Sequence, residues 1–112
     1  MASGRNKVDV VRSSGNVFND LRLSGAEEKQ TKVRLAVAIN QIIQDQRIPQ
    51  IEAARRLSIN QPKISALANY RLEGFSVERL LNFLNALDRD IEIVIRRKTG
   101  SRRAARIHVT AA

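Results

Sequence analysis

The chain has 112 residues, with 20 Lys and Arg against 11 Asp and Glu, so its formal net charge at pH 7 is +9. This length suits one small domain, and the absence of cysteine excludes a disulfide framework, a thiolate metal site and a cysteine nucleophile. No apolar run approaches the roughly 18 residues of a membrane-spanning helix. We therefore expect a small cytoplasmic protein without membrane contact, whose basic balance favours a polyanionic partner.

The positive charge is concentrated at the C-terminal end. Residues 26–95 carry ten basic and nine acidic side chains, whereas residues 96–112 carry six basic side chains and no acidic one. The start of the chain is rich in Gly, Ser and Asn. We expect a partly irregular N-terminal arm over residues 1–25, a folded domain over residues 26–98 and a basic, flexible tail over residues 99–112.

The first two predicted helices lie on either side of Pro49. Apolar residues at helical spacing predict a helix from Gly25 to about Gln46, which ends before the proline because a residue preceding proline disfavours helical backbone angles. After the proline, apolar residues repeat every three positions from Gln50 to Leu57. This spacing predicts a second, short helix.

Two capping residues predict where the next helices begin. Asn60 can cap a helix that starts at Gln61, because Pro62 is tolerated only in the first turn of a helix. Ser76 can cap a helix whose apolar residues continue to Leu87 at the i, i+3, i+4 and i+7 spacing. The fold class is therefore predicted to be mainly α, with four to five helices.

The spacing of the apolar residues changes from helical to alternating after the last predicted helix. Isoleucines alternate with other residues from Asp90 to Arg97, which predicts a C-terminal β-strand. A lone strand leaves backbone groups unpaired, so it would pair either with Val8–Val11 or with the same strand of a second copy. We favour the second copy, because pairing across a two-fold axis would form a two-stranded ribbon and hence a dimer. The predicted dimerisation residues are Ile91, Ile93 and Ile95.

Residues 50–69 have the pattern of a helix–turn–helix motif. Ala54 is small enough for two short helices to approach closely, Ile59 can fill the gap at the turn, and Ile64 can pack the second helix onto the core. An ordinary helical hairpin is the alternative, but the polar face led by glutamine favours DNA, because amides can pair with adenine edges. The predicted DNA-binding residues are Gln50, Asn60, Gln61, Lys63, Ser65, Ala66, Asn69 and Arg71.

The spacing of Gln50, Ala54, Ile59, Gln61 and Ile64 resembles the XRE helix–turn–helix family. A wider similarity, from about residue 16 to residue 98, resembles a subgroup close to HigA-type antitoxins. The resemblance implies a lambda-repressor-like fold and a homodimeric regulator of transcription, a repressor that binds a palindromic operator in double-stranded DNA. By position, Gln61 would lead the base contacts and Gln50 would contact a phosphate.

The sequence departs from the family pattern at several positions, among them Ser58 and Pro49. The turn position that is commonly glycine is Ser58, so a serine would have to adopt any positive φ there. The usual serine or threonine cap of the first motif helix is replaced by Pro49, which has no capping oxygen. These changes leave the predicted fold intact.

An antitoxin is the alternative function, and it would bind and neutralise a RelE-like toxin. Four apolar residues of the N-terminal arm could order on such a partner. They are Val17, Phe18, Leu21 and Leu23. The single histidine and the serines have no arrangement suited to a metal or to nucleophilic catalysis, so we expect neither an enzyme nor a cofactor. A DNA-binding protein of this kind is expected on the nucleoid.

Overall fold

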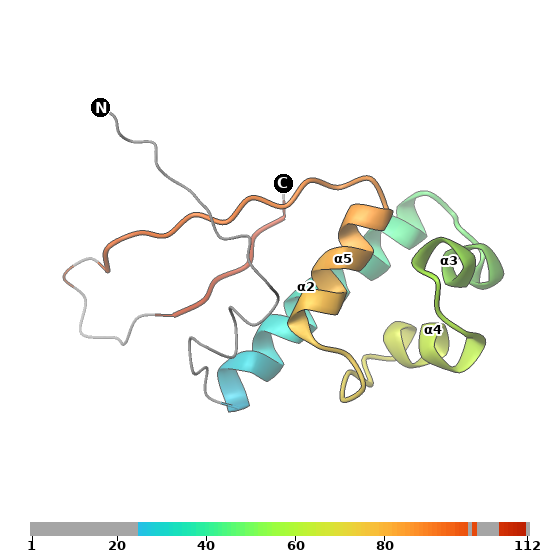
Figure 1. The fold of residues 1–112 in the computed structure, drawn as a ribbon, viewed down its shortest axis with the longest axis horizontal. Helices are drawn as coiled ribbons and strands as arrows, with labels where there is room; N and C mark the ends of the chain where they lie inside the picture. The colour runs from blue at the N-terminus through green and yellow to red at the C-terminus, as the bar shows by residue number, and fades with distance from the viewer. Residues whose placement is uncertain (1–24, 99, 101–105, 112) are drawn as a thin grey trace.

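The computed structural model describes residues 25–98, 100 and 106–111. This part of the chain forms four helices, α2 (Gly25–Asp45), α3 (Gln50–Leu57), α4 (Gln61–Ala68) and α5 (Val77–Ala86). Helices α2 and α5 pack against each other, and the two short helices lie together at one side of that pair (Figure 1). The four predicted helices and the mainly α fold class are confirmed. No helix in the described ranges is long and apolar enough to cross a membrane.

The core is built from the inward faces of all four helices. Its largest fully buried side chains are Ile39 of α2, Leu67 of α4, Leu80 of α5 and Leu87 after α5. An eight-residue helix is unstable alone in water, so α3 and α4 depend on this packing. The other buried apolar side chains are Leu35, Ala36, Ala53, Ala54, Leu57, Ile64, Leu72, Phe75, Val77, Phe83 and Leu84.

Side chains cap α4 and α5 where the sequence predicts it. The Asn60 side-chain oxygen accepts the backbone N–H of Lys63 at 3.0 Å, and the Ser76 hydroxyl oxygen accepts that of Arg79 at 3.0 Å. Each bond satisfies a donor that a helix start leaves without an intrahelical partner. Pro49 precedes α3 without a side-chain cap, as expected.

Each described helix is followed by a left-handed residue that is not glycine. These residues have φ values of 54° at Arg47, 57° at Ser58, 59° at Tyr70 and 64° at Asp88. A left-handed residue turns the chain so that its N–H groups can bond the last carbonyls of the helix. Ser58 adopts a positive φ at the motif turn position that is commonly glycine, and its N–H bonds back to the carbonyls of α3.

The predicted C-terminal strand is not seen in this single copy of the chain. Residues 89–98 are extended and exposed, and no strand is present in the described part of the chain. A strand requires a ladder of hydrogen bonds to a neighbouring strand, and one copy of the chain supplies no such neighbour among the described residues. The alternative partner, Val8–Val11, lies outside the described residues. Figure 1 shows the segment extending away from α3 and α4.

Residues 106–111 return along α2. The backbone N–H of Ile107 donates to the Glu27 carboxylate at 2.8 Å, and the Arg34 guanidinium lies 3.3 Å from Nδ1 of His108. Val109 packs against the core. The described end of the basic tail is therefore fixed to the first described helix by main-chain, side-chain and apolar contacts.

Candidate nucleic-acid interface

Helices α3 and α4 form a compact helix–turn–helix unit. Ala54 and Ile64 are buried, Ile59 is half-buried, and the Ile59 N–H donates to the Ala54 carbonyl at 3.0 Å. The small side chain of Ala54 permits this close approach, and Ile59 packs against the core at the turn between the helices. The turn from Ser58 to Asn60 thus fixes α4 relative to α3.

The two glutamines at the starts of α3 and α4 bond to each other. The Gln61 side-chain N–H donates to the side-chain oxygen of Gln50 at 2.7 Å, and both side chains are exposed. This bond leaves Gln61 with one N–H and its carbonyl oxygen, and it leaves Gln50 with its amide N–H groups. The pair is therefore pre-oriented to present a donor and an acceptor from α4 beside a donor from α3.

Lys63 points toward the loop between α4 and α5. Its ammonium donates to the Gly74 carbonyl at 3.3 Å and lies 5.0 Å from the ring centroid of Phe75. The guanidinium of Arg79 also lies over this ring, at 6.0 Å, and Phe75 packs edge-to-face on Phe83 with centroids 5.8 Å apart. Cations over aromatic faces are attracted by the ring quadrupole. Lys63 thus connects α4 to the next loop.

The comparisons with known proteins agree with this geometry. A family model described as a helix-turn-helix domain matches residues 17–96. A solved structure named as an XRE family transcriptional regulator shares 65% identity, with a TM-score of 0.76 over 80% of this chain and 100% of its own. The chain belongs to the XRE helix–turn–helix family. No curated protein matches it significantly. Its family makes it a DNA-binding regulator of transcription.

The remaining predicted DNA-binding residues lie on or next to α4 of this XRE-type motif. Asn60 uses its side-chain oxygen as the helix cap, and Asn69 donates its side-chain N–H to the Ser65 carbonyl at 2.9 Å. Ser65 and Ala66 are half-buried, whereas Asn69 and Arg71 are exposed. The structure therefore brings the predicted set onto one motif, with Lys63 turned toward the loop.

Ion pairs balance the basic residues of α3. Arg55 donates to Glu52 at 3.0 Å, and this hydrogen bond lowers the pKa of Glu52 and raises the pKa of Arg55. Arg56 lies 3.9 Å from Asp88. Both pairs are at the surface, so they add little stability. In the described part of the chain, Arg71 makes no ion pair and remains the cation beside α4 that can meet a phosphate.

Sequence reasoning missed two features near the motif. It did not predict the bond between Gln50 and Gln61, although two glutamines at consecutive helix starts were a signal for it. The spacing also placed Ile51 on one apolar face with Ala54 and Leu57, and this expectation is wrong, because Ile51 is 77% exposed. Because Ile51 is next to Gln50 in α3, its exposed side chain lies at the edge of the candidate interface.

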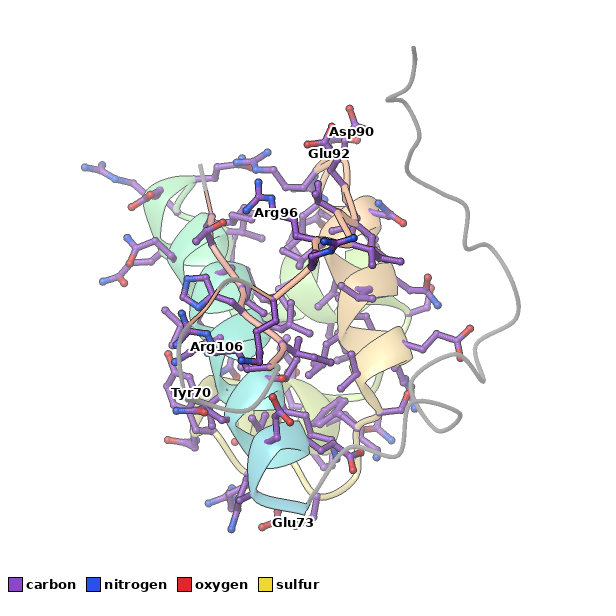
Figure 2. The ribbon with its side chains drawn as sticks, turned by 90° about the vertical axis from the view of Figure 1, so that its left-hand side faces the viewer. Tyr70, Glu73, Asp90, Glu92, Arg96 and Arg106 are labelled. Atoms are coloured by element: carbon purple, nitrogen blue, oxygen red, sulfur yellow. The ribbon has the colours of Figure 1, made fainter. Side chains whose placement is uncertain are left out.

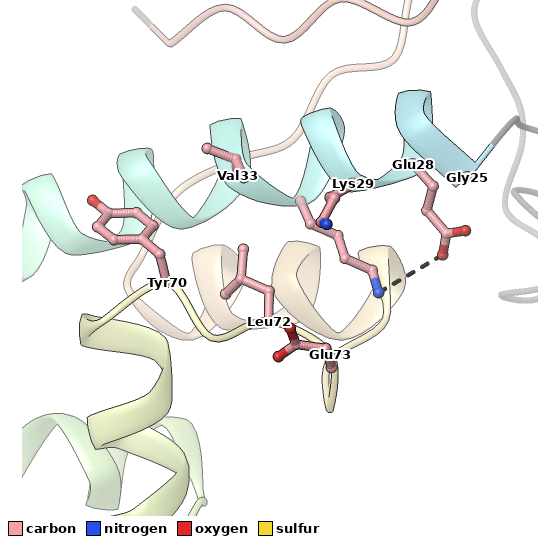
Figure 3. Close-up of a pocket in the computed structure, with 8 residues that line it drawn as sticks. Gly25, Glu28, Lys29, Val33, Tyr70, Leu72 and Glu73 are labelled. Carbon is pink, nitrogen blue, oxygen red and sulfur yellow. Dashed lines mark ion pairs between the residues drawn. The ribbon is translucent and has the colours of Figure 1, made fainter.

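A shallow groove lies between α2 and the loop that follows α4. Figure 3 shows the ion pair between Glu28 and Lys32 along one side, with N–O separation 3.8 Å, and Glu73 on the other side. Tyr70 and Leu72 add an apolar part to the lining. Because lysines and carboxylates both line the groove, its charge favours neither an anion nor a cation.

Proposed function

We propose that this chain is a sequence-specific repressor that acts on the nucleoid and binds a palindromic operator in double-stranded DNA as a homodimer. The observation that carries the proposal is the 2.7 Å bond between Gln61 and Gln50. An adenine edge in the major groove needs one donor and one acceptor, which Gln61 retains. A phosphate needs a donor, which Gln50 retains at the start of α3.

The proposed contacts follow the direction of α4. In the major groove, Gln61, Ser65, Ala66 and Asn69 would face base edges, with Ala66 supplying an apolar contact to a thymine methyl. Arg71, immediately beyond α4, would meet a phosphate. Asn60 would contribute through its remaining amide N–H groups at the helix start. Specificity would then depend on uncharged side chains, and salt-dependent affinity on Arg71 and the basic tail.

Lys63 has a positioning role in this proposal. Its ammonium is occupied by the Gly74 carbonyl and the Phe75 ring, so it would fix the angle of α4 against the following loop rather than contact DNA. A Cβ atom added at Gly74 would lie 2.8 Å from the Lys63 ammonium nitrogen. Replacing Gly74 by alanine would therefore displace the ammonium while keeping its charge.

Lys63→Met and Gly74→Ala should each weaken operator binding by about two- to fivefold, because each removes a cation–π contact and a carbonyl bond. Neither should change the slope of log affinity against log salt. A phosphate contact by Lys63 would instead reduce the slope by about 0.9 in Lys63→Met. Fluorescence anisotropy across a salt series measures both quantities, and Lys29→Met on the exposed side of α2 is the matched control.

The homodimer is proposed from residues 89–98. Their extended backbone leaves α5 in a direction away from α3 and α4, and it carries exposed apolar side chains, including Ile95 at 79% exposure (Figure 1). Pairing Ile91, Ile93 and Ile95 with the same segment of a second copy would satisfy backbone groups and cover apolar surface. Symmetric pairing would also explain a palindromic site.

The antitoxin alternative depends on Val17, Phe18, Leu21 and Leu23, which lie outside the described residues. The resemblance to HigA-type antitoxins and the RelE-like toxin partner stay predictions. The geometry of α3 and α4 favours DNA as the partner, so the repressor is the function proposed.

Selection of random DNA duplexes by the purified full-length chain tests the proposal. We expect enrichment of one inverted repeat whose half-sites lie about one helical turn apart, or a multiple of it. Enrichment of a single half-site would contradict dimeric binding. Recovery of unenriched DNA would contradict sequence-specific recognition altogether.

Gln61→Ala should then reduce the free energy of binding to the selected duplex by about 1–3 kcal/mol and leave binding to random DNA nearly unchanged. The physical reason is the loss of a two-point amide contact with one base. Gln30→Ala removes an exposed glutamine from α2 and is the control. Equal losses on both duplexes would show that Gln61 does not read a base.

A further inference from the structure

The charges of residues 90–98 are arranged with opposite signs about Val94. Asp90 and Glu92 precede it and Arg96 and Lys98 follow it, all at alternate positions. In an extended backbone, alternate side chains share one face, so these four charges and Val94 lie on the same face. Reversing the direction of the segment therefore exchanges each acidic residue for a basic one.

Three of these charges have no opposite charge nearby in the described structure. Asp90, Glu92 and Arg96 are exposed, and none takes part in an ion pair among the residues described. Asp90 and Glu92 project to the same side at the top of Figure 2. Val94 is 55% exposed and Ile95 is 79% exposed. The segment thus presents charge and apolar surface together, without a partner strand.

We infer that two copies of the chain pair antiparallel through this segment, with the two-fold axis passing through Val94. This inference rests on the proposed homodimer and specifies its register. Glu92 then lies opposite the partner's Arg96, and Asp90 lies opposite the partner's Lys98. By symmetry each pair occurs twice, so four opposite-charge pairs flank the contact between the two Val94 side chains.

Other arrangements of the same segment are disfavoured by charge. Parallel pairing in register places every charge opposite its own copy, which is repulsive. Antiparallel pairing about Ile93 keeps one attractive pair, Asp90 opposite the partner's Arg96, but it places Glu92 opposite the partner's Val94 and Arg89 opposite the partner's Arg97. Antiparallel pairing about Val94 places no like charges of this segment opposite each other. On the other face of the segment, it places Ile93 opposite the partner's Ile95. The charge order therefore favours pairing about Val94 over pairing about Ile93.

Charge exchange between Glu92 and Arg96 tests this register in the full-length chain. Glu92→Lys and Arg96→Glu should each weaken the dimer about tenfold, because each places like charges opposite at two symmetric sites. The double variant should restore the wild-type dimer. An equimolar mixture of the two single variants should form a heterodimer, in which every such pair is attractive. Sedimentation velocity at low ionic strength measures these outcomes, since salt screens surface pairs.

The possible outcomes separate the register from the homodimer. Single variants that dimerise as tightly as the wild type would overturn the register and leave the homodimer standing. Restoration by Asp90→Lys with Arg96→Glu, in place of Glu92→Lys with Arg96→Glu, would overturn it in favour of pairing about Ile93. A wild-type chain that sediments as a monomer while binding the selected duplex would overturn the homodimer itself.

Discussion

Leu67→Ala is expected to lower the free energy of unfolding by about 2–5 kcal/mol. Leu67 is fully buried on the inner side of α4, where its truncation removes apolar contacts and leaves a cavity. The stability of a small domain is only about 5–15 kcal/mol, so this single change removes a large part of it. Urea unfolding followed by far-UV circular dichroism measures the change, at one fixed protomer concentration because dimerisation would add to stability.

Ile51→Ala is the matched control for this truncation. It also shortens a large aliphatic side chain on a short motif helix, but Ile51 is 77% exposed, so its loss should change stability by no more than about 0.5 kcal/mol. Equal effects of the two variants would contradict the burial of the inner side of α4. Leu67 also carries the carbonyl that accepts the Asn40 side-chain N–H at 3.1 Å, so α4 is tied to α2 at this residue.

Local signals in the sequence were sufficient to predict the helices. Asn60 before Pro62 and Ser76 before a periodic apolar run both mark helix starts through bonds within four residues along the chain. The helix–turn–helix packing was also predictable, because Ala54 and Ile59 meet across a turn only a few residues long. In each case the physical cause lies close in sequence.

Contacts between distant residues could not be predicted from the same patterns. Phe75 is buried in a loop outside any helical period, and it becomes part of the core because α5 brings Phe83 against it. The contact of Ile107 with Glu27 joins residues 80 positions apart. The spacing of apolar residues does not predict contacts between such distant residues, because these contacts depend on how complete helices pack.

The candidate site likewise has some features that local sequence patterns predict and others that depend on how the helices pack. The residue types at the starts of α3 and α4 predicted a candidate set of DNA-binding side chains, but not that Gln61 bonds to Gln50 or that Lys63 turns to Gly74. Those orientations depend on the angle between helices. The predicted strand is not seen for a related reason: the alternation of Ile91, Ile93 and Ile95 with other residues predicts two different faces, whereas a strand also requires a neighbouring strand.

Ile93→Pro is expected to convert the dimer into a monomer. Proline fixes φ near −65°, which bends the paired segment, and it has no backbone N–H, which removes a ladder bond where that N–H faces the partner. The fold of one copy should be unaffected, because residues 89–98 are exposed and lie beyond the end of α5. Sedimentation velocity measures the mass, and thermal unfolding by circular dichroism verifies that the helices are retained.

A monomeric variant should also bind the selected inverted repeat much more weakly than the wild type while retaining contact with one half-site, since its α3 and α4 are unchanged. Successive backbone N–H groups in an extended chain point to opposite edges, so Val94→Pro tests the edge that Ile93→Pro does not. Ile93→Ala keeps the N–H and is the control. Dimers that persist in both proline variants would contradict pairing through residues 89–98, because one of the two substitutions must remove a donor from the ladder.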